Sequence, residues 1–156
     1  DNLQNGPIAL QLGGRDPQIL SFAAAIGLAY GYDSINLNCG CPSNAVSLGQ
    51  RSGGAALMKE PQHVARCVEA MSERMHKMMV VEKKKKTLHT IPLLSVKHRL
   101  GVHEASTYNA EKDKSRNDDE AFQSCRSFVK QITHASHVSK LHVHARLALL
   151  GSFDPL

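Results

Sequence analysis

The sequence lacks features that define several classes of protein. Its longest apolar stretches, such as residues 19–30, are interrupted and shorter than the roughly 20 residues of a membrane-spanning helix, so we expect no transmembrane segment. Its four cysteines are irregularly spaced, unlike the dense frameworks of small disulfide-bonded domains. We therefore expect four thiols in a reducing compartment. We take this compartment to be the cytoplasm, and an organelle is the alternative.

Motifs for metal and phosphate binding are also missing. Cys39 and Cys41 flank a single glycine, and no second cluster of Cys or His follows at the spacing that zinc requires. His142 and His144 would share one face of a strand. We interpret them as one contact to a bound small molecule and one neighbouring side chain, rather than as a pair of metal ligands. No Gly-x-Gly-x-x-Gly run opens a helix. We expect no bound metal and interpret the glycine pairs as turns.

Composition and charge are those of a soluble globular unit. Hydrophobic residues make up 42% of the 156 residues and charged residues 21%, which suits one domain or a piece of a larger one. Residues 1–80 hold six basic and six acidic side chains, whereas residues 81–156 hold thirteen and eight. A basic half suits a polyanion such as RNA, but charge alone favours an ordinary solvated surface.

Strand and helix patterns alternate along the chain. Short apolar runs predict strands at residues 8–12, 34–38, 93–97 and 141–144. Asp16 and Pro17 predict the start of a helix that ends at Gly31. Further helices are expected over residues 61–75 and from about Asp119, with an exposed connection at residues 82–86 and a loop or insertion at residues 103–120. This alternation predicts an α/β protein with a parallel sheet.

Unusual polar residues stand at or just past the end of each expected strand. They are Gln11, Asn38 with Cys41, Lys97 with Arg99, and His144 with Arg146. In a parallel β/α barrel these strand ends form the active-site face. An open doubly wound sheet uses the same edge, so the spacing leaves both architectures open.

The end of the second expected strand carries the run Asn36-Leu37-Asn38-Cys39-Gly40-Cys41-Pro42-Ser43. This run, together with residues 8–14, 54–58, 96–101 and 143–146 in the same order, resembles the tRNA-dihydrouridine synthase family. The sequence is most like the branch that acts at positions 20 and 20a of the D-loop. The resemblance extends from residue 8 to residue 149.

The resemblance implies a fold, an activity and a set of partners. The fold would be an FMN-binding TIM (β/α)8 barrel, of which about four β/α units are visible. Residues 1–156 would form part of the catalytic barrel, without the C-terminal helical RNA-binding domain. The implied reaction is the FMN-dependent, NADPH-driven reduction of uridine to 5,6-dihydrouridine in tRNA, by a monomer.

Four positions match flavin ligands of that family. Gln11 and Asn38 look like contacts to the edge of the flavin ring. Lys97 is similar to the lysine near flavin N1 and O2, where a cation would stabilise the negative charge of reduced flavin. His144 looks like the histidine that contacts the flavin.

Three further positions match residues that act on the substrate. Cys41 stands where the family has its proton donor, and a thiol is mostly protonated at neutral pH yet able to release its proton. Cys39, two residues earlier, is interpreted as structural. Arg99 and Arg146 resemble residues that approach the RNA or the target uridine.

Two departures from the family pattern accompany the resemblance. The connection over residues 75–90 is longer and more basic than usual, and Leu147 stands where a lysine commonly occurs. Two other functions therefore stay open. One is a truncated, non-catalytic RNA-binding remnant, and the other is another FMN barrel, such as a dihydropyrimidine or dihydroorotate dehydrogenase.

Overall fold

Four parallel strands and three long helices form the body of the protein. The computed structural model describes residues 7–47, 53–85, 91–108 and 114–151. The sheet contains, side by side, β1 (Ala9–Leu12), β2 (Ser34–Cys39), β3 (Leu93–Arg99) and β5 (Lys140–His144). The helices that follow the first three of these strands are α1 (Pro17–Ala29), α3 (Pro61–Lys85) and α4 (Lys114–Ala135). The four predicted strands and three predicted helices are confirmed.

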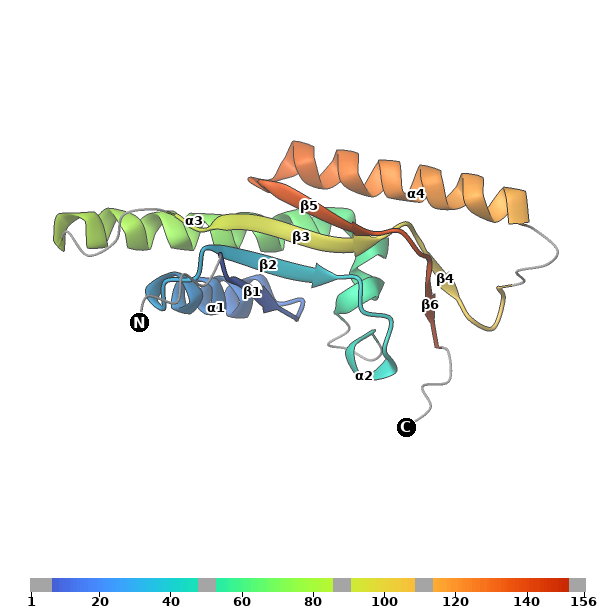
Figure 1. Ribbon diagram of the computed structural model, residues 1–156, viewed down its shortest axis with the longest axis horizontal. Coiled ribbons are helices and arrows are strands. Elements are labelled where there is room, and N and C mark those ends of the chain that lie inside the picture. Colours follow the sequence, from blue (N-terminus) through green and yellow to red (C-terminus); the bar gives the residue numbers. More distant parts are fainter. Residues whose placement is uncertain (1–6, 48–52, 86–90, 109–113, 152–156) are drawn as a thin grey trace.

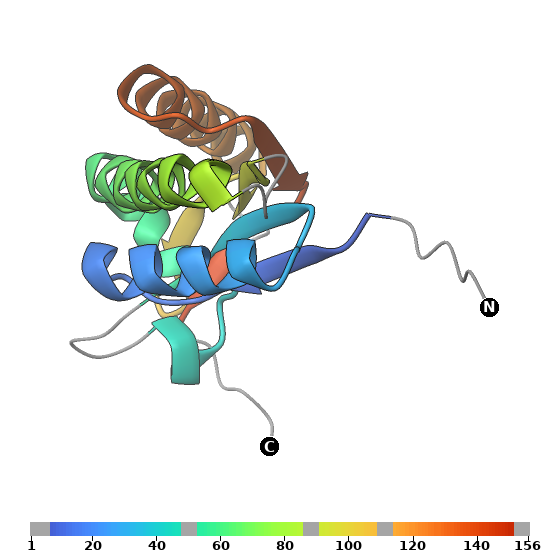
Figure 2. The same cartoon turned by 90° about the vertical axis from the view of Figure 1, so that its left-hand side faces the viewer.

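The three long helices lie along one face of this sheet (Figures 1 and 2). The strands follow one another across the sheet in chain order, without a reversal among the described strands. A doubly wound sheet has helices on both faces and a point at which the strand order reverses. The arrangement is therefore a sector of a β/α barrel, in which helices cover only the outer face.

Helix α1 begins where the sequence predicts. Asp16 caps it, because Oδ1 accepts hydrogen bonds from the backbone N–H groups of Gln18 (2.8 Å) and Ile19 (3.0 Å). Pro17 occupies the first turn, where its missing N–H costs nothing. Gly31 follows the helix with φ of +78°, a conformation that favours glycine.

The core lies between the sheet and its helices. Ile35, Leu37 and Cys39 alternate along β2 on the helix side and are fully buried. They pack with the buried face of α3, including Val68 and Met71. Alternation along a strand sends the intervening residues to the opposite face. The sheet consequently has an apolar outer face and leaves its inner face to polar residues.

The predicted C-terminus of α3 and the predicted N-terminus of α4 are wrong. Helix α3 continues to Lys85 rather than ending near residue 75, so residues 82–85 are helical and not a connection; residue 86 lies outside the described residues. Lysine and glutamate form helices well, and each like-charge pair costs only a few tenths of a kcal/mol. The loop predicted at 103–120 includes the last two residues of β4 (Val102–Glu104) and the start of α4, with residues 109–113 outside the described residues.

Four short elements escaped prediction. They are β4, β6 (Ala148–Leu150), α2 (Asn44–Ser47) and the 3-10 helix η1 (Gly54–Lys59). Strands β4 and β6 continue beyond β3 and β5 after a bend and form a separate parallel pair (Figure 1). Ala148 and Leu150 pack there against Ala55 of η1, and Lys59 pairs with Glu104. This second cluster holds η1 close to the ends of the central strands.

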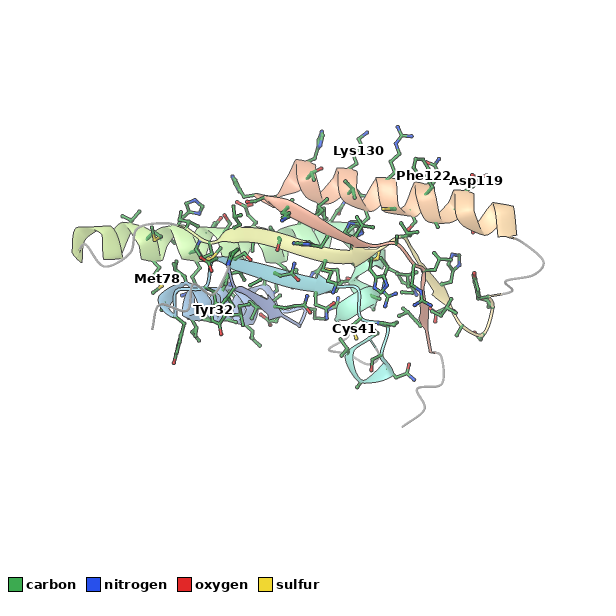
Figure 3. The ribbon with its side chains drawn as sticks, viewed as in Figure 1. Tyr32, Cys41, Met78, Asp119, Phe122 and Lys130 are labelled. Carbon is green, nitrogen blue, oxygen red and sulfur yellow. The ribbon has the colours of Figure 1, made fainter. Side chains whose placement is uncertain are left out.

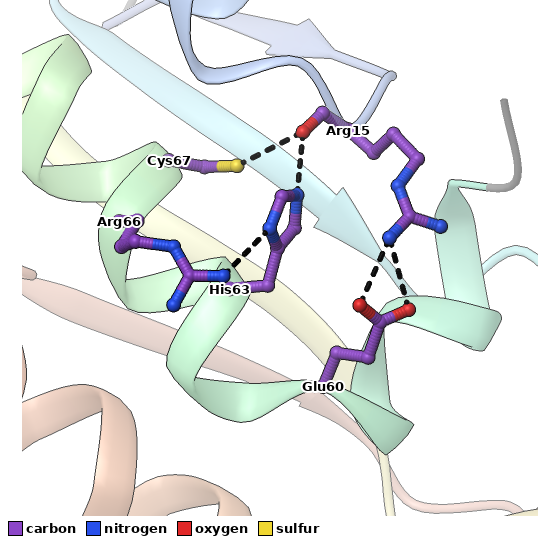
Figure 4. Close-up of polar contacts among 5 residues, drawn as sticks. All are labelled: Arg15, Glu60, His63, Arg66 and Cys67. Atoms are coloured by element: carbon purple, nitrogen blue, oxygen red, sulfur yellow. Dashed lines mark hydrogen bonds and ion pairs between the residues drawn. The ribbon is translucent and has the colours of Figure 1, made fainter.

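The turn after β1 is tied to the start of α3 by a group of polar contacts (Figure 4). Arg15 reaches both carboxylate oxygens of Glu60, at 3.1 and 2.9 Å. Its carbonyl oxygen accepts a hydrogen bond from Nε2 of His63 (2.6 Å), while Nδ1 of that ring accepts one from Arg66 (3.1 Å).

No helix among the described residues is long and apolar enough to span a bilayer.

Candidate functional site

Six of the seven residues singled out in the sequence line one pocket. The pocket has a volume of about 270 Å³, and its walls contain Gln11, Asn38, Cys41, Lys97, Arg99 and His144, with Gly40 and Pro42. Cys41 lies just beyond the end of β2, where the chain leaves the sheet (Figure 3). The pocket thus brings together the polar residues expected at the strand ends, with the exception of Arg146. The chemical roles assigned to these residues remain predictions.

The strand register explains this convergence. Asn38 is level with Lys97 on the neighbouring strand, and Arg99 is level with His144. Lys97 and Arg99 alternate with the buried Val96 and His98 along β3. These four polar side chains therefore belong to the face away from the helices. In a β/α barrel this face is the interior.

A row of hydrogen bonds crosses this inner face one layer below the pocket. Nε2 of Gln11 donates to Oδ1 of Asn36 (2.7 Å), and Nδ2 of Asn36 donates to Oγ of Ser95 (2.9 Å). Oγ of Ser95 in turn donates to the carbonyl oxygen of Ile35 (3.3 Å). Asn36 and Ser95 are buried, and buried amides are stable only when they are paired. The row fixes the orientation of the Gln11 amide.

The loop that carries Cys41 is organised by Asn38. Oδ1 of Asn38 accepts hydrogen bonds from the backbone N–H groups of Gly40 (2.9 Å) and Cys41 (3.1 Å). This is the local turn that asparagine side chains favour. Because Oδ1 is engaged in the loop, the Nδ2 group is the part of Asn38 suited to donate to a ligand.

The carbonyl oxygen of Cys41 is also held. It accepts hydrogen bonds from Oγ of Ser47 (2.7 Å) and from the backbone N–H of Ala55 (2.8 Å). Gly54, with φ of +56°, brings η1 against the loop at this point. The sequence predicts Gly54 as a turn residue within the matching segment 54–58 and predicts no role for Ser47. Their contacts join segments whose proximity depends on tertiary packing.

Positive charge surrounds His144. The guanidinium of Arg99 lowers the pKa of this imidazole, followed by burial and by the charges of Arg146 and Lys97. A protonated imidazole would be repelled by these cations, so the neutral form of His144 is favoured at neutral pH. The site is therefore a cationic pocket with a neutral histidine at its edge.

Cys41 differs from the other three cysteines in its surroundings. All four are free thiols, as predicted. Burial raises the pKa of Cys67 to about 11, raises that of Cys39 much further with a contribution from Cys67, and also raises that of Cys125. Cys39 is fully buried in the core, which agrees with a structural role, whereas Cys41 is half-buried and lines the pocket.

Arg146 and His142 do not join the pocket. Arg146 lines a separate hollow with Phe122 and Leu147, where α4 meets the junction between β5 and β6. His142 is exposed on β5. Among the described residues, no three His, Cys, Asp or Glu side chains are placed to hold a metal ion. A larger hollow of about 550 Å³ lies between residues 13–20 and His63, but it contains none of the predicted site residues.

Comparison with known proteins identifies the family of the chain. The family model for dihydrouridine synthases matches residues 1–148. The chain belongs to the dihydrouridine synthase family. This membership favours the tRNA-dihydrouridine synthase resemblance over the other FMN barrels considered for the sequence.

Curated relatives of the family match nearly all of the chain. A tRNA-dihydrouridine(20/20a) synthase from Xanthomonas axonopodis pv. citri is 40% identical over 149 residues, which is 96% of this chain and 35% of the relative. The protein of the same name from Synechocystis is 38% identical, with the same two coverages. The one from Vibrio vulnificus is 36% identical over 99% of this chain and 38% of its own length. The chain thus spans a little over a third of these dihydrouridine synthases.

The size of the pocket agrees with this partial coverage. Ligand pockets usually enclose roughly 300–1,000 Å³, so the 270 Å³ enclosed here is small for a complete dihydrouridine synthase site. Four parallel strands form only half of the eight in a closed barrel. The described residues therefore form part of a barrel, and the pocket lies at the strand ends of that part.

Proposed function

We propose that this chain supplies the cysteine-bearing wall of a flavin enzyme that reduces uridine to 5,6-dihydrouridine in the D-loop of tRNA. The observation that supports the proposal is the pocket in which Cys41 stands beside Asn38, Lys97 and His144. The names of the relatives support tRNA as the substrate and a uridine at position 20 or 20a as the target.

The donors and acceptors of the pocket suit the edge of an FMN ring. Nδ2 of Asn38 would donate to it, since the Asn38 oxygen already holds the cysteine loop. Gln11 would present its oxygen to a ring N–H, since its nitrogen is engaged with Asn36. Lys97 would place its ammonium near N1 and O2, where reduced flavin is negatively charged. His144 would contact the flavin in its neutral form.

Cys41 would act as the proton donor. The chemistry that FMN supplies when bound is hydride donation to C6 of the uracil ring, with NADPH as the source of electrons. Sγ of Cys41 gives its proton to C5, and the resulting thiolate regains a proton from solvent. The hydride and the proton together saturate the C5=C6 bond and leave the product uncharged.

The basic residues would bind the RNA. The target uridine must leave its base stack to reach the flavin, so its flanking backbone has to be held. Arg99 lies in the pocket and Arg146 lies outside it. We therefore assign Arg99 to the side of the uridine and Arg146 to a backbone phosphate.

The proposal is tested by the absorbance spectrum of the purified protein and by dihydrouridine formation on an unmodified tRNA transcript. We expect bound FMN, its reduction by NADPH, and reduction of D-loop uridine. Cys41→Ala should abolish dihydrouridine formation and leave FMN reduction by NADPH intact, whereas Cys125→Ala should leave both intact. Unchanged turnover in Cys41→Ala would contradict the assigned proton donor. Binding of tRNA without bound FMN would instead favour a non-catalytic remnant.

A further inference from the structure

Every polar backbone atom of Gly40 and Cys41 has a hydrogen-bond partner. The two N–H groups share Oδ1 of Asn38, and the Cys41 carbonyl oxygen is bound by Ser47 and Ala55. The remaining atom, the carbonyl oxygen of Gly40, accepts a hydrogen bond from Nε of Arg99 at 2.8 Å. The thiol is thus carried by a backbone segment that has little freedom to shift.

Arg99 differs from the other partners in its place in the fold. Asn38 precedes the loop directly in β2, whereas Arg99 ends the neighbouring strand β3, 59 residues away from Gly40 in the chain. Lys97, the proposed flavin ligand, lies two residues earlier on the same strand and lines the same pocket. The Arg99 bond therefore links the loop of the proton donor to the strand of a flavin ligand.

The backbone of Arg99 is itself held on both sides. Its N–H donates to Sδ of Met58 in η1 (3.3 Å), and its carbonyl oxygen accepts a hydrogen bond from Nδ1 of His98 (2.7 Å). His98 is fully buried and its ring packs against Phe128 of α4, with 5.1 Å between centroids. A side chain that starts from such a fixed point can hold another segment in place.

We propose that Arg99 is a positioning residue that fixes Sγ of Cys41 relative to the flavin ligands by binding the Gly40 carbonyl oxygen through Nε. This inference deepens the proposed function and rests on it. A guanidinium has five N–H donors, so the bond through Nε is compatible with contacts from the other nitrogens to the substrate. Arg99 thus has a task in the site that is separate from its charge.

Two substitutions separate the two tasks because the side chains of glutamine and methionine both extend to the ε position, at which Arg99 has its Nε. Arg99→Gln places an N–H donor where Nε stands, without the charge. Arg99→Met places a methyl group there, with neither donor nor charge. Arg99→Lys keeps the positive charge but has a methylene at that position. The positioning role depends on the donor, and binding of RNA by charge depends on the cation.

The first measurement is the rate of alkylation of Cys41 by iodoacetamide, with and without added FMN, followed by peptide mass spectrometry with Cys125 as an internal reference. Loss of one hydrogen bond of about 1 kcal/mol should loosen the loop and raise the Cys41 rate roughly fivefold in Arg99→Met. Arg99→Gln should stay within about twofold of wild type, because it keeps the bond. The Cys125 rate should be equal in wild type and in the Arg99 variants.

The second measurement separates kcat from tRNA affinity. A displacement of about 1 Å in a reacting group can cost roughly 100-fold, so we expect kcat to fall about 10- to 100-fold in Arg99→Met. The loss should be several times smaller in Arg99→Gln. Affinity for tRNA should fall equally in both, because both lose the charge. Arg146→Gln and Arg146→Met are the matched controls and should not differ from each other in kcat or in Cys41 alkylation.

Two results would overturn the inference. One is equal alkylation and equal kcat in Arg99→Gln and Arg99→Met. The other is a higher kcat in Arg99→Lys than in Arg99→Gln, which would make the charge the important property. A wild-type protein that reduces no uridine would contradict the proposed function instead. The alkylation comparison would still decide whether Arg99 positions Cys41.

Discussion

Gly54 runs so close to Cys41 that a β-carbon on residue 54 would lie 2.5 Å from the Cys41 carbonyl oxygen. The same β-carbon would lie 2.9 Å from Cγ1 of Val46. The close approach lets Ala55 donate its backbone N–H to that oxygen. The cysteine loop thus depends on the absence of a side chain at residue 54, in addition to the hydrogen bonds that it receives.

Replacing Gly54 by alanine should therefore destabilise the protein strongly. The φ of +56° strains any other residue, and the β-carbon clashes with backbone, so we expect a loss of about 2–4 kcal/mol in the free energy of unfolding. Gly31 also has a positive φ but open space around it, and Gly31→Ala should cost only about 1 kcal/mol. Urea unfolding measures both, and equal losses would mean that the contact with Cys41 is unimportant.

Substitutions of Asn38 should separate its oxygen from its nitrogen. Asn38→Asp keeps an acceptor for the N–H groups of Gly40 and Cys41, but it lacks the Nδ2 donor proposed for the flavin. We expect stability close to wild type and FMN affinity reduced about tenfold. Asn38→Ala should lower both. Fluorescence titration with FMN and urea unfolding test this, and wild-type FMN affinity in Asn38→Asp would remove Nδ2 from the proposed ligands.

The hydrogen-bonded row beneath the pocket should matter for stability. Ser95→Ala leaves the buried Nδ2 of Asn36 without the acceptor that it has now, which should cost about 1–3 kcal/mol. Thr133→Ala removes a hydroxyl of similar size that bonds to the Val129 carbonyl oxygen on the exposed side of α4, and should change stability by less than about 0.5 kcal/mol. Thermal unfolding of the pair gives the comparison. The prediction fails if the two substitutions have the same effect.

Acid should destabilise the protein partly through His98. Burial lowers the pKa of this imidazole below its ordinary value, despite the opposing effect of its bond to the Arg99 carbonyl oxygen. Below the ordinary pKa, the unfolded chain takes up a proton that the folded protein does not, so the free energy of unfolding falls as pH drops from about 7 toward 5. Urea unfolding at these two pH values should show a smaller decrease for His98→Gln than for wild type. His134→Gln, at an exposed position, should keep the wild-type decrease.

Local sequence patterns predicted the elements that have a distinct apolar face. Strand β2 was predicted within one residue of its end, because Ile35 and Leu37 alternate with polar residues. The first turns of α4 were missed, because residues 114–120 contain no apolar side chain that could show a helical period. Strands β4 and β6 have three residues each, too few for a period to show.

The candidate site was predicted more fully than the contacts that support it. Gln11, Asn38, Cys41, Lys97, Arg99 and His144 were all singled out and share one pocket. Arg146 was grouped with them but lies in another hollow. Asn36 and Ser95 were not assigned a role, although Asn36 stands two residues before Asn38 and therefore on the same face of the strand. That spacing was the one available signal.

Local sequence was enough to predict the four central strands, the three long helices and the polar residues at the strand ends. Those properties depend on neighbours within a few residues, and periodicity records them. The bonds of Gln11 to Asn36, 25 residues away, and of Arg99 to Gly40, 59 residues away, depend on the tertiary structure. Such pairs form because strand register and helix packing bring distant segments to hydrogen-bonding distance, and no local pattern encodes that distance.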